Sequence, residues 1–206
     1  MFTLRKEKQL MLAALILGTA ITLLLIVGFK MIGKEEALLN ENFLRFHVLA
    51  NSDSEEDQAL KLKVRDAVID YLEPVLKSSE SKEETKRYIL KHLPQITDVA
   101  GRVLREAGSS DSLRVMLGVS EFPTKSYGSV TLPAGRYEAL RIEIGAAEGH
   151  NWWCVMFPSL CFVDEMDEEE FAEMEERQLP EEAGEFVHHP NSFRFKLLEW
   201  LHEVFS

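Results

Sequence analysis

The order of hydrophobic and polar positions separates an apolar run near the N-terminus from a longer, patterned remainder. Residues Leu10–Phe29 are twenty consecutive positions without a charged side chain. As a helix that rises about 1.5 Å per residue, this run spans the roughly 30 Å hydrocarbon core of a membrane. We therefore expect residues 1–30 to form a signal peptide or a signal anchor outside the globular part.

The flanks of this run indicate its orientation. Arg5, Lys6 and Lys8 precede it, and basic residues before a first apolar helix favour a cytoplasmic N-terminus and export of the rest. Gly18–Ala20 has the small residues of a cleavage site, but the run continues to Phe29, which favours an uncleaved anchor. A cleaved signal peptide and a buried core helix are the alternatives.

The exported part begins with a predicted linker, residues 31–42, and a predicted strand. Residues 43–51 alternate apolar and polar positions, which is the pattern of a strand buried on one face. The polar face of this strand carries Arg45, His47 and Asn51.

Three helices are predicted after this strand. Ser52 offers an N-cap for the first, with Glu55 three residues on as its capping-box partner. Its apolar stripe recurs every four residues: Leu60, Val64, Val68, Leu72 and Leu76. The second helix is expected to start after Ser81, and the third to cover residues 94–107.

The second half of the chain changes to strand patterns. Residues 113–119 and 137–144 alternate, and residues 127–132 are also typical of a strand. The turn residues Pro133–Gly135 predict a hairpin between the last two of these segments.

Two further segments complete the expected domain. The acidic residues 164–185 are predicted to form a surface helix and a loop, and the second half of residues 191–205 an amphipathic helix docked on the sheet. This order of elements predicts an α+β domain over residues 43–206, with a largely antiparallel sheet and packed helices, preceded by one N-terminal hydrophobic segment.

The charge balance excludes one class of partner. The chain has 23 Lys and Arg against 35 Asp and Glu, a net charge of -12. A nucleic-acid-binding protein needs a basic surface to replace the counterions of phosphates, so this class is not expected. Anionic lipid head groups should also repel the exported part.

The cysteines allow two interpretations. Cys154 and Cys161 would have Cα atoms about 10 Å apart in one helix and over about 20 Å apart in one strand, whereas a disulfide needs roughly 4.4–6.8 Å. A disulfide therefore requires a turn between them, which Pro158 and Ser159 can supply, and export permits the oxidation. We favour the disulfide, with two buried free thiols as the alternative.

A third interpretation makes Cys154 a nucleophile. A reactive thiolate needs an imidazole to lower its pKa, and His150 and His47 are candidates. Nothing in their spacing specifies such a site. Glycine-rich nucleotide motifs and a nucleophile elbow do not occur in the sequence, and no cofactor is predicted.

Metal binding has weaker support. Residues 51–57 are rich in oxygen ligands but lack the glycine and the distal glutamate of an EF-hand loop. Acidic residues at a helix start explain this segment better, since they favour the positive end of the helix dipole. His188 and His189 lack a spaced third ligand, so no metal site is predicted.

The two adjacent tryptophans bear on partner binding. Trp152 and Trp153 in a strand point to opposite faces, and an exposed tryptophan is a favoured interface anchor. Burial of both is the alternative. Residues on polar strand faces or at strand ends are the partner-binding candidates: Arg45, His47, Asn51, Asp53, Trp152 and Trp153.

Five segments of the chain together match a known family. They are Arg45–Asp53, Asp57–Asp66, Leu132–Arg141, Asn151–Phe162 and Phe195–Trp200. The combination of RFHVLANSDS with NWWCVMFPSLCF is highly specific and resembles the stage II sporulation protein R family of endospore-forming bacteria. The resemblance does not extend to the acidic residues 167–182, so it implies nothing about their role.

The resemblance implies a role that the patterns themselves do not. Members of the family are made in the forespore and exported into the space between the two membranes of the septum. There they signal to a membrane-embedded aspartic protease, which processes the sigma-E precursor. The resemblance thus implies a signalling protein and not an enzyme, and it provides no catalytic residues. The alternative is an extracytoplasmic cysteine hydrolase that uses Cys154 and a histidine.

Overall fold

The computed structural model describes the backbone of residues 2–205 and their side chains, except the side chains of residues 2–7, 25, 29, 31, 32, 163–165, 193, 194, 198, 201 and 205. Its contacts divide the chain into two units, residues 1–37 and residues 38–206. Helix α1 extends over Phe2–Asn42, so the predicted linker 31–42 is helical. Within α1, Lys8–Asn42 is long and apolar enough to cross a membrane, which indicates export or membrane anchoring.

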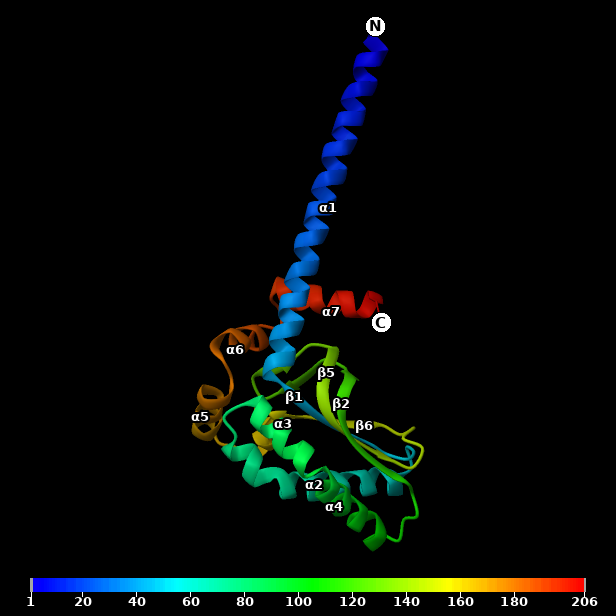
Figure 1. Ribbon diagram of the computed structural model, residues 1–206, viewed down its shortest axis with the longest axis vertical. Helices are drawn as coiled ribbons and strands as arrows, with labels where there is room; N and C mark the ends of the chain where they lie inside the picture. The colour runs from blue at the N-terminus through cyan, green and yellow to red at the C-terminus, as the bar shows by residue number, and fades with distance from the viewer. Residues whose placement is uncertain (1, 206) are drawn as a thin grey trace. The chain divides into compact units, whose positions relative to one another are not determined.

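A four-stranded sheet forms the centre of the second unit (Figure 1). Its order is β2 (Leu113–Phe122), β5 (Gly135–Ile144), β1 (Leu44–Leu49) and β6 (Asn151–Phe157). The pairs β2–β5 and β1–β6 are antiparallel, and β5–β1 is parallel. The predicted α+β fold with a largely antiparallel sheet is therefore confirmed.

Three helices follow β1 and lie on one side of the sheet (Figure 1). They are α2 (Glu55–Ser78), α3 (Lys82–Lys91) and α4 (Leu93–Glu106). The predicted stripe of α2 is buried against the sheet residues Phe46 and Ile142 in the main core. Burial of this stripe stabilises the layer, because each fully buried aliphatic side chain contributes about 1.5–3 kcal/mol.

The helix caps agree with the sequence at one position and differ at another. Ser81 caps α3 as predicted, since its side chain accepts a hydrogen bond from the Glu84 amide. The cap of α2 is Ser54 and not Ser52: Ser54 Oγ accepts from the Asp57 amide at 3.1 Å. Ser52 Oγ instead donates to the Asp57 carboxylate, which the spacing of the two serines alone could not decide.

The prediction that β1 is half-buried is wrong. All six residues of β1 are buried, because β1 lies between β5 and β6 and because aromatic rings cover the side chains of Arg45 and His47. The alternation in the sequence separates an apolar from a polar face, but it does not show that distant aromatic residues cover the polar one.

The predicted hairpin around Pro133–Gly135 is also wrong. Strand β4 (Val130–Leu132) pairs with β3 (Lys125–Tyr127), and β5 pairs with β2. Between β3 and β4 the chain turns at Gly128, whose φ of 58° is in the left-handed region that favours glycine. This glycine divides the predicted strand 127–132 in two.

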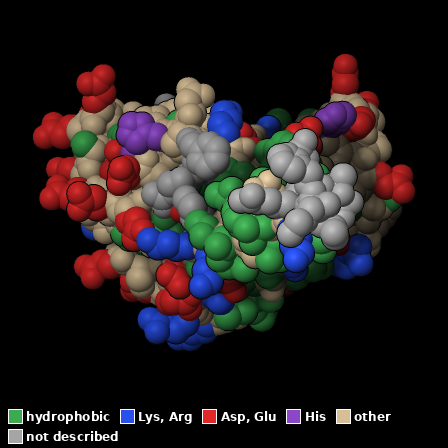
Figure 2. Space-filling view, turned by 90° about the horizontal axis from the view of Figure 1, so that it is seen from above, with side chains coloured by type: hydrophobic (Ala, Val, Ile, Leu, Met, Phe, Trp, Pro, Cys, Tyr) green, Lys and Arg blue, Asp and Glu red, His purple; other side chains and the backbone are tan. Residues whose placement is uncertain are grey.

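The C-terminal part is helical. A 3-10 helix, η1 (Leu160–Glu165), is followed by α5 (Glu168–Gln178), α6 (Glu181–His188) and α7 (Phe193–Phe205). In the space-filling view, acidic side chains gather mainly at the left, the side on which Figure 1 places α5 (Figure 2). The predicted acidic surface helix is thus observed, but the predicted loop is a second helix, α6.

Helix α7 has described contacts with α6 and with the end of β2. Its described contacts reach Phe186 of α6 through Phe195, and Thr124 after β2 through Glu199. The His202 ring lies 3.9 Å from the Glu121 carboxylate near the end of β2. These contacts place the described side chains of α7 near the end of β2. The predicted docking of the helix on the sheet depends on the apolar side chains of residues 193, 198, 201 and 205, which lie outside the described residues.

Candidate functional site

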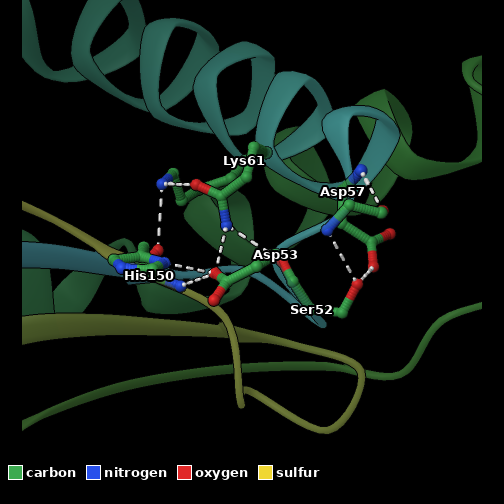
Figure 3. Close-up of polar contacts among 7 residues, drawn as sticks. Ser52, Asp53, Asp57, Lys61 and His150 are labelled. Carbon is green, nitrogen blue, oxygen red and sulfur yellow. Dashed lines mark hydrogen bonds and ion pairs between the residues drawn. The ribbon is translucent and has the colours of Figure 1, made fainter.

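Polar side chains connect the end of β1, the first turns of α2 and the start of β6 (Figure 3). Asp53 Oδ1 accepts a hydrogen bond from the His150 amide at 2.6 Å and lies 2.5 Å from His150 Nδ1. Asp57 Oδ2 accepts from Ser52 Oγ at 2.5 Å and from Asn51 Nδ2 at 2.9 Å. We call this set the loop cluster: Asn51, Ser52, Asp53, Asp57, Gln58, Lys61 and His150.

Two long side chains of α2 complete the loop cluster. Lys61 Nζ donates to the His150 carbonyl at 2.9 Å and to Gln58 Oε1 at 2.5 Å. Gln58 Nε2 in turn donates to the Ser52 carbonyl at 2.9 Å. Asp53 follows β1 and His150 precedes β6, and the two residues are 97 positions apart in sequence. The hydrogen bonds of the loop cluster therefore hold together two segments that are distant along the chain.

The electrostatics of the loop cluster favour ionised carboxylates. Hydrogen bonds from the backbone and ring of His150 lower the pKa of Asp53. Hydrogen bonds from Ser52 and Asn51 lower the pKa of Asp57. Both carboxylates already have donors, and no group of three or more metal-ligating side chains occurs among the residues that the structure describes. The arrangement is suited to fixing two loops.

Two glycines explain how the two loops approach so closely. A Cβ atom added at Gly149 would lie 2.2 Å from the Ser52 carbonyl oxygen, and one at Gly145 would lie 2.2 Å from Asn51 Oδ1. Asn51 Oδ1 also accepts from the Ala146 amide at 2.9 Å. Sequence reasoning missed both glycines, although two glycines four residues apart between strands signal a close backbone approach.

The face of the sheet opposite α2 and α4, here the open face, carries the other candidate residues. One row crosses all four strands in register: Met116 of β2, Arg141 of β5, His47 of β1 and Trp153 of β6. We call these four residues the open-face row. In the next row, Arg114 of β2 is paired with Glu143 of β5.

One end of the open face is closed by aromatic rings around Arg45. The guanidinium carbon lies 4.2 Å from the centroid of the Phe122 ring and 5.0 Å from that of Tyr137. Arg45 Nε donates to the Cys154 carbonyl at 3.2 Å and Nη2 to the Tyr127 hydroxyl at 2.9 Å. Arg45 is fully buried, so it is not the surface group that the sequence predicted. Cation–π contacts replace a carboxylate partner here.

His47 is also buried rather than exposed. Its ring stacks on Trp153 with centroids 5.0 Å apart, and Nε2 lies 3.2 Å from Ser120 Oγ. Burial, with the nearby guanidinium groups of Arg141 and Arg45, lowers the pKa of His47 to about 3. The imidazole is therefore neutral at physiological pH, and a role as a charged surface contact is not available to it in this fold.

The two tryptophans point to opposite faces, as predicted. Trp152 packs against the core, edge-on to Phe46 at 5.6 Å, and the Arg65 guanidinium lies 5.0 Å from its ring centroid. Trp153 lies on the open face, between His47 and Phe122. Both side chains are half-buried, so neither predicted alternative, one exposed tryptophan or two buried ones, holds in full.

The two cysteines are bonded in the structure. Cys154 of β6 and Cys161 of η1 have Cα atoms 5.6 Å apart, because the chain turns at Pro158 and Ser159. Cys154 is buried in the core on the helix-covered face, whereas His47 lies on the open face. His150 is bound to Asp53 in the loop cluster. The residues named for a cysteine nucleophile and its base are therefore not brought together.

The two candidate metal histidines are in different surroundings. His188 Nε2 lies 2.8 Å from the Glu175 carboxylate, which joins α6 to α5. His189 follows α6 and is exposed. The structure thus separates the predicted site residues into two groups, the loop cluster with Asn51 and Asp53, and the open face with Trp153 above the buried Arg45 and His47.

Comparison with known proteins identifies the family. A family model described as "Stage II sporulation protein R" matches residues 40–167, which include the strands, the loop cluster and the disulfide. The chain is 34% identical over 191 residues to the stage II sporulation protein R of Bacillus subtilis (strain 168), covering 84% of this chain and 85% of the relative. No solved structure matches. The chain belongs to the stage II sporulation protein R family.

Proposed function

We propose that this protein is an exported sporulation signal that activates a membrane-embedded aspartic protease, which then processes the sigma-E precursor. Its place of action is the space between forespore and mother cell. The observation that carries the proposal is the family match over residues 40–167, together with an N-terminal helix long enough to cross a membrane.

The proposed signal acts by binding. A ligand shifts a receptor toward its active state only through a difference in affinity for the two states, so the protein needs a rigid, displayed surface. The loop cluster and the disulfide supply rigidity, since each fixes a segment next to β6. The half-buried Trp153 and the exposed Arg114 supply accessible groups on the open face.

A catalytic role for Cys154 has less support. Its sulfur is bonded to Cys161, and the imidazole of His47 lies on the other face of the sheet. Thiol labelling of the purified full chain with iodoacetamide distinguishes the two functions. The signal function predicts no labelling without prior reduction, whereas the hydrolase predicts one reactive Cys154.

Complementation of sporulating cells that lack the gene tests the proposal. The full chain should restore processing of the sigma-E precursor on an immunoblot, and a C-terminal fusion to a phosphatase that is active only outside the cytosol should be active. A version without residues 1–30 should stay in the cytosol and leave the precursor unprocessed. Processing by this cytosolic version would contradict the proposal.

A further inference from the structure

The open face carries positive charge on an otherwise acidic domain. After residue 30 the chain has 19 Lys and Arg against 34 Asp and Glu. On the open face, Arg114 and Arg141 both pair with Glu143, with Arg114 Nη2 at 2.6 Å. The Glu143 side chain is only 6% exposed, whereas those of Arg114 and Arg141 are 66% and 35% exposed. Solvent therefore meets the two guanidinium groups and little of the carboxylate that they share.

The charge of this surface does not depend on His47. The imidazole lies between Arg141 and Trp153 in the open-face row but is buried and neutral at physiological pH. The accessible members of the row are thus a cation, an exposed thioether and an aromatic ring: Arg141, Met116 and Trp153. Aromatic, Met and Arg side chains are the types that are enriched at protein interfaces.

A hollow continues the surface beyond Trp153. It has a volume of about 330 Å³ and lies between the β3 residues Lys125 and Tyr127 and the edge strand β6. Lys125 carries the charge among its lining residues. The Tyr127 hydroxyl accepts from Arg45, so its own proton remains for an acceptor in the hollow.

The dimensions fit an extended peptide. The open-face row crosses four strands, and three spacings of about 4.8 Å place its ends roughly 14 Å apart. An extended chain of four or five residues spans this length at about 3.3 Å per residue.

From these observations we propose that the open face binds an extended, acidic segment of the partner protein. A carboxylate of this segment would lie against Arg114 and Arg141, and an apolar side chain would lie on Trp153 and in the adjoining hollow. The inference rests on the proposed function, because it names the surface through which the signal reaches its receptor.

A double charge reversal tests the electrostatic part. We expect R114E with R141E to lower the rate of sigma-E precursor processing at least tenfold in complemented sporulating cells. The variant with R114K and R141K, which keeps the charge, should retain most of the activity. The matched control is R102E with R105E on α4, two exposed arginines on the other side of the sheet, which should leave processing unchanged.

Site-specific crosslinking tests the location. A photoreactive benzoylphenylalanine at Met116, which is 37% exposed, should form an adduct with the tagged protease in sporulating cells. The same probe at the exposed Leu90 of α3 should not. A Lys substitution for an acidic residue in the crosslinked segment of the protease should restore processing by the R114E R141E variant.

The outcomes separate the two proposals. Failure of the wild-type chain to restore processing overturns the proposed function itself. Normal processing by R114E with R141E, while the wild type is active, overturns only the inference. An adduct with lipid at position 116, in place of the protease, would also overturn it and assign the surface to the membrane.

Discussion

At the scale of single residues, buried polar side chains connect the sequence motif to the fold. Arg45, His47 and Asn51 belong to the run RFHVLANSDS, but they do not form one surface. Arg45 and His47 are covered by aromatic rings of other segments, and Asn51 binds two loops together. Their structural roles explain why this motif marks the family without requiring any of the three to contact a partner.

The buried imidazole of His47 makes stability depend on pH. Its pKa is about 3 in the fold and about 6.5 in the unfolded chain, so between these values the unfolded state binds more protons. Stability is therefore complete above pH 6.5 and falls as the pH decreases. We expect the free energy of unfolding to drop by about 2 kcal/mol between pH 7.5 and pH 5, measured by urea titration. His47→Gln should remove most of this drop, and an unchanged pH dependence would contradict the assignment.

Gly149 sets the distance between the two loops. Gly149→Ala places a methyl group 2.2 Å from the Ser52 carbonyl oxygen, so the backbone must shift. We expect a loss of roughly 1–3 kcal/mol in the free energy of unfolding, the usual range for overpacking. Gly118→Ala is the matched control, since nothing lies within 4 Å of the added Cβ atom, and it should leave the urea midpoint nearly unchanged.

At the scale of elements, the sequence predicts the helices better than the strand pairing. The stripe of α2 and the cap of α3 depend on neighbours three or four residues away, and the sequence predicts both correctly. The pairing of β5 with β2 joins segments that are distant in sequence. The choice of Ser54 as the cap of α2 depends on the hydrogen bond from Ser52 to Asp57. Such choices are decided by long-range contacts, which a local pattern does not contain.

The cap of α2 can be tested directly. Ser54→Ala removes the acceptor for the Asp57 amide, so we expect the free energy of unfolding to fall by about 1 kcal/mol. Ser54→Thr keeps a hydroxyl and should be close to wild type in the same denaturant titration. Equal losses in the two variants would show that the hydroxyl is not the stabilising group.

The disulfide stabilises the connection between β6 and η1. Cys154→Ser and Cys161→Ser should each lower the free energy of unfolding by about 2–3 kcal/mol, the chain-entropy value for so short a loop. Because both substitutions remove the same bond, the double variant should lose about as much as either one. Additive losses in thermal melts would contradict a shared bond.

At the scale of the whole molecule, residues 38–206 contain the sheet, its helices and the disulfide. We expect this fragment to fold without residues 1–37 and to unfold in one transition. Circular dichroism and tryptophan fluorescence should give the same midpoint, since Trp152 packs against the main core and Trp153 stacks on the buried His47. Two separate midpoints would show that the fragment lacks a single cooperative core.

The central position of β1 has a consequence for biosynthesis. The ribosome completes this wholly buried strand early, yet Arg45 meets Cys154 only after 109 further residues have been made. Until β5 has been made β1 has neither neighbour, and until β6 has been made it has only one. An unpaired strand of this kind is prone to aggregate. A nascent chain of this kind therefore depends on a holding chaperone, or on rapid passage out of the compartment of synthesis, until its last strand has emerged.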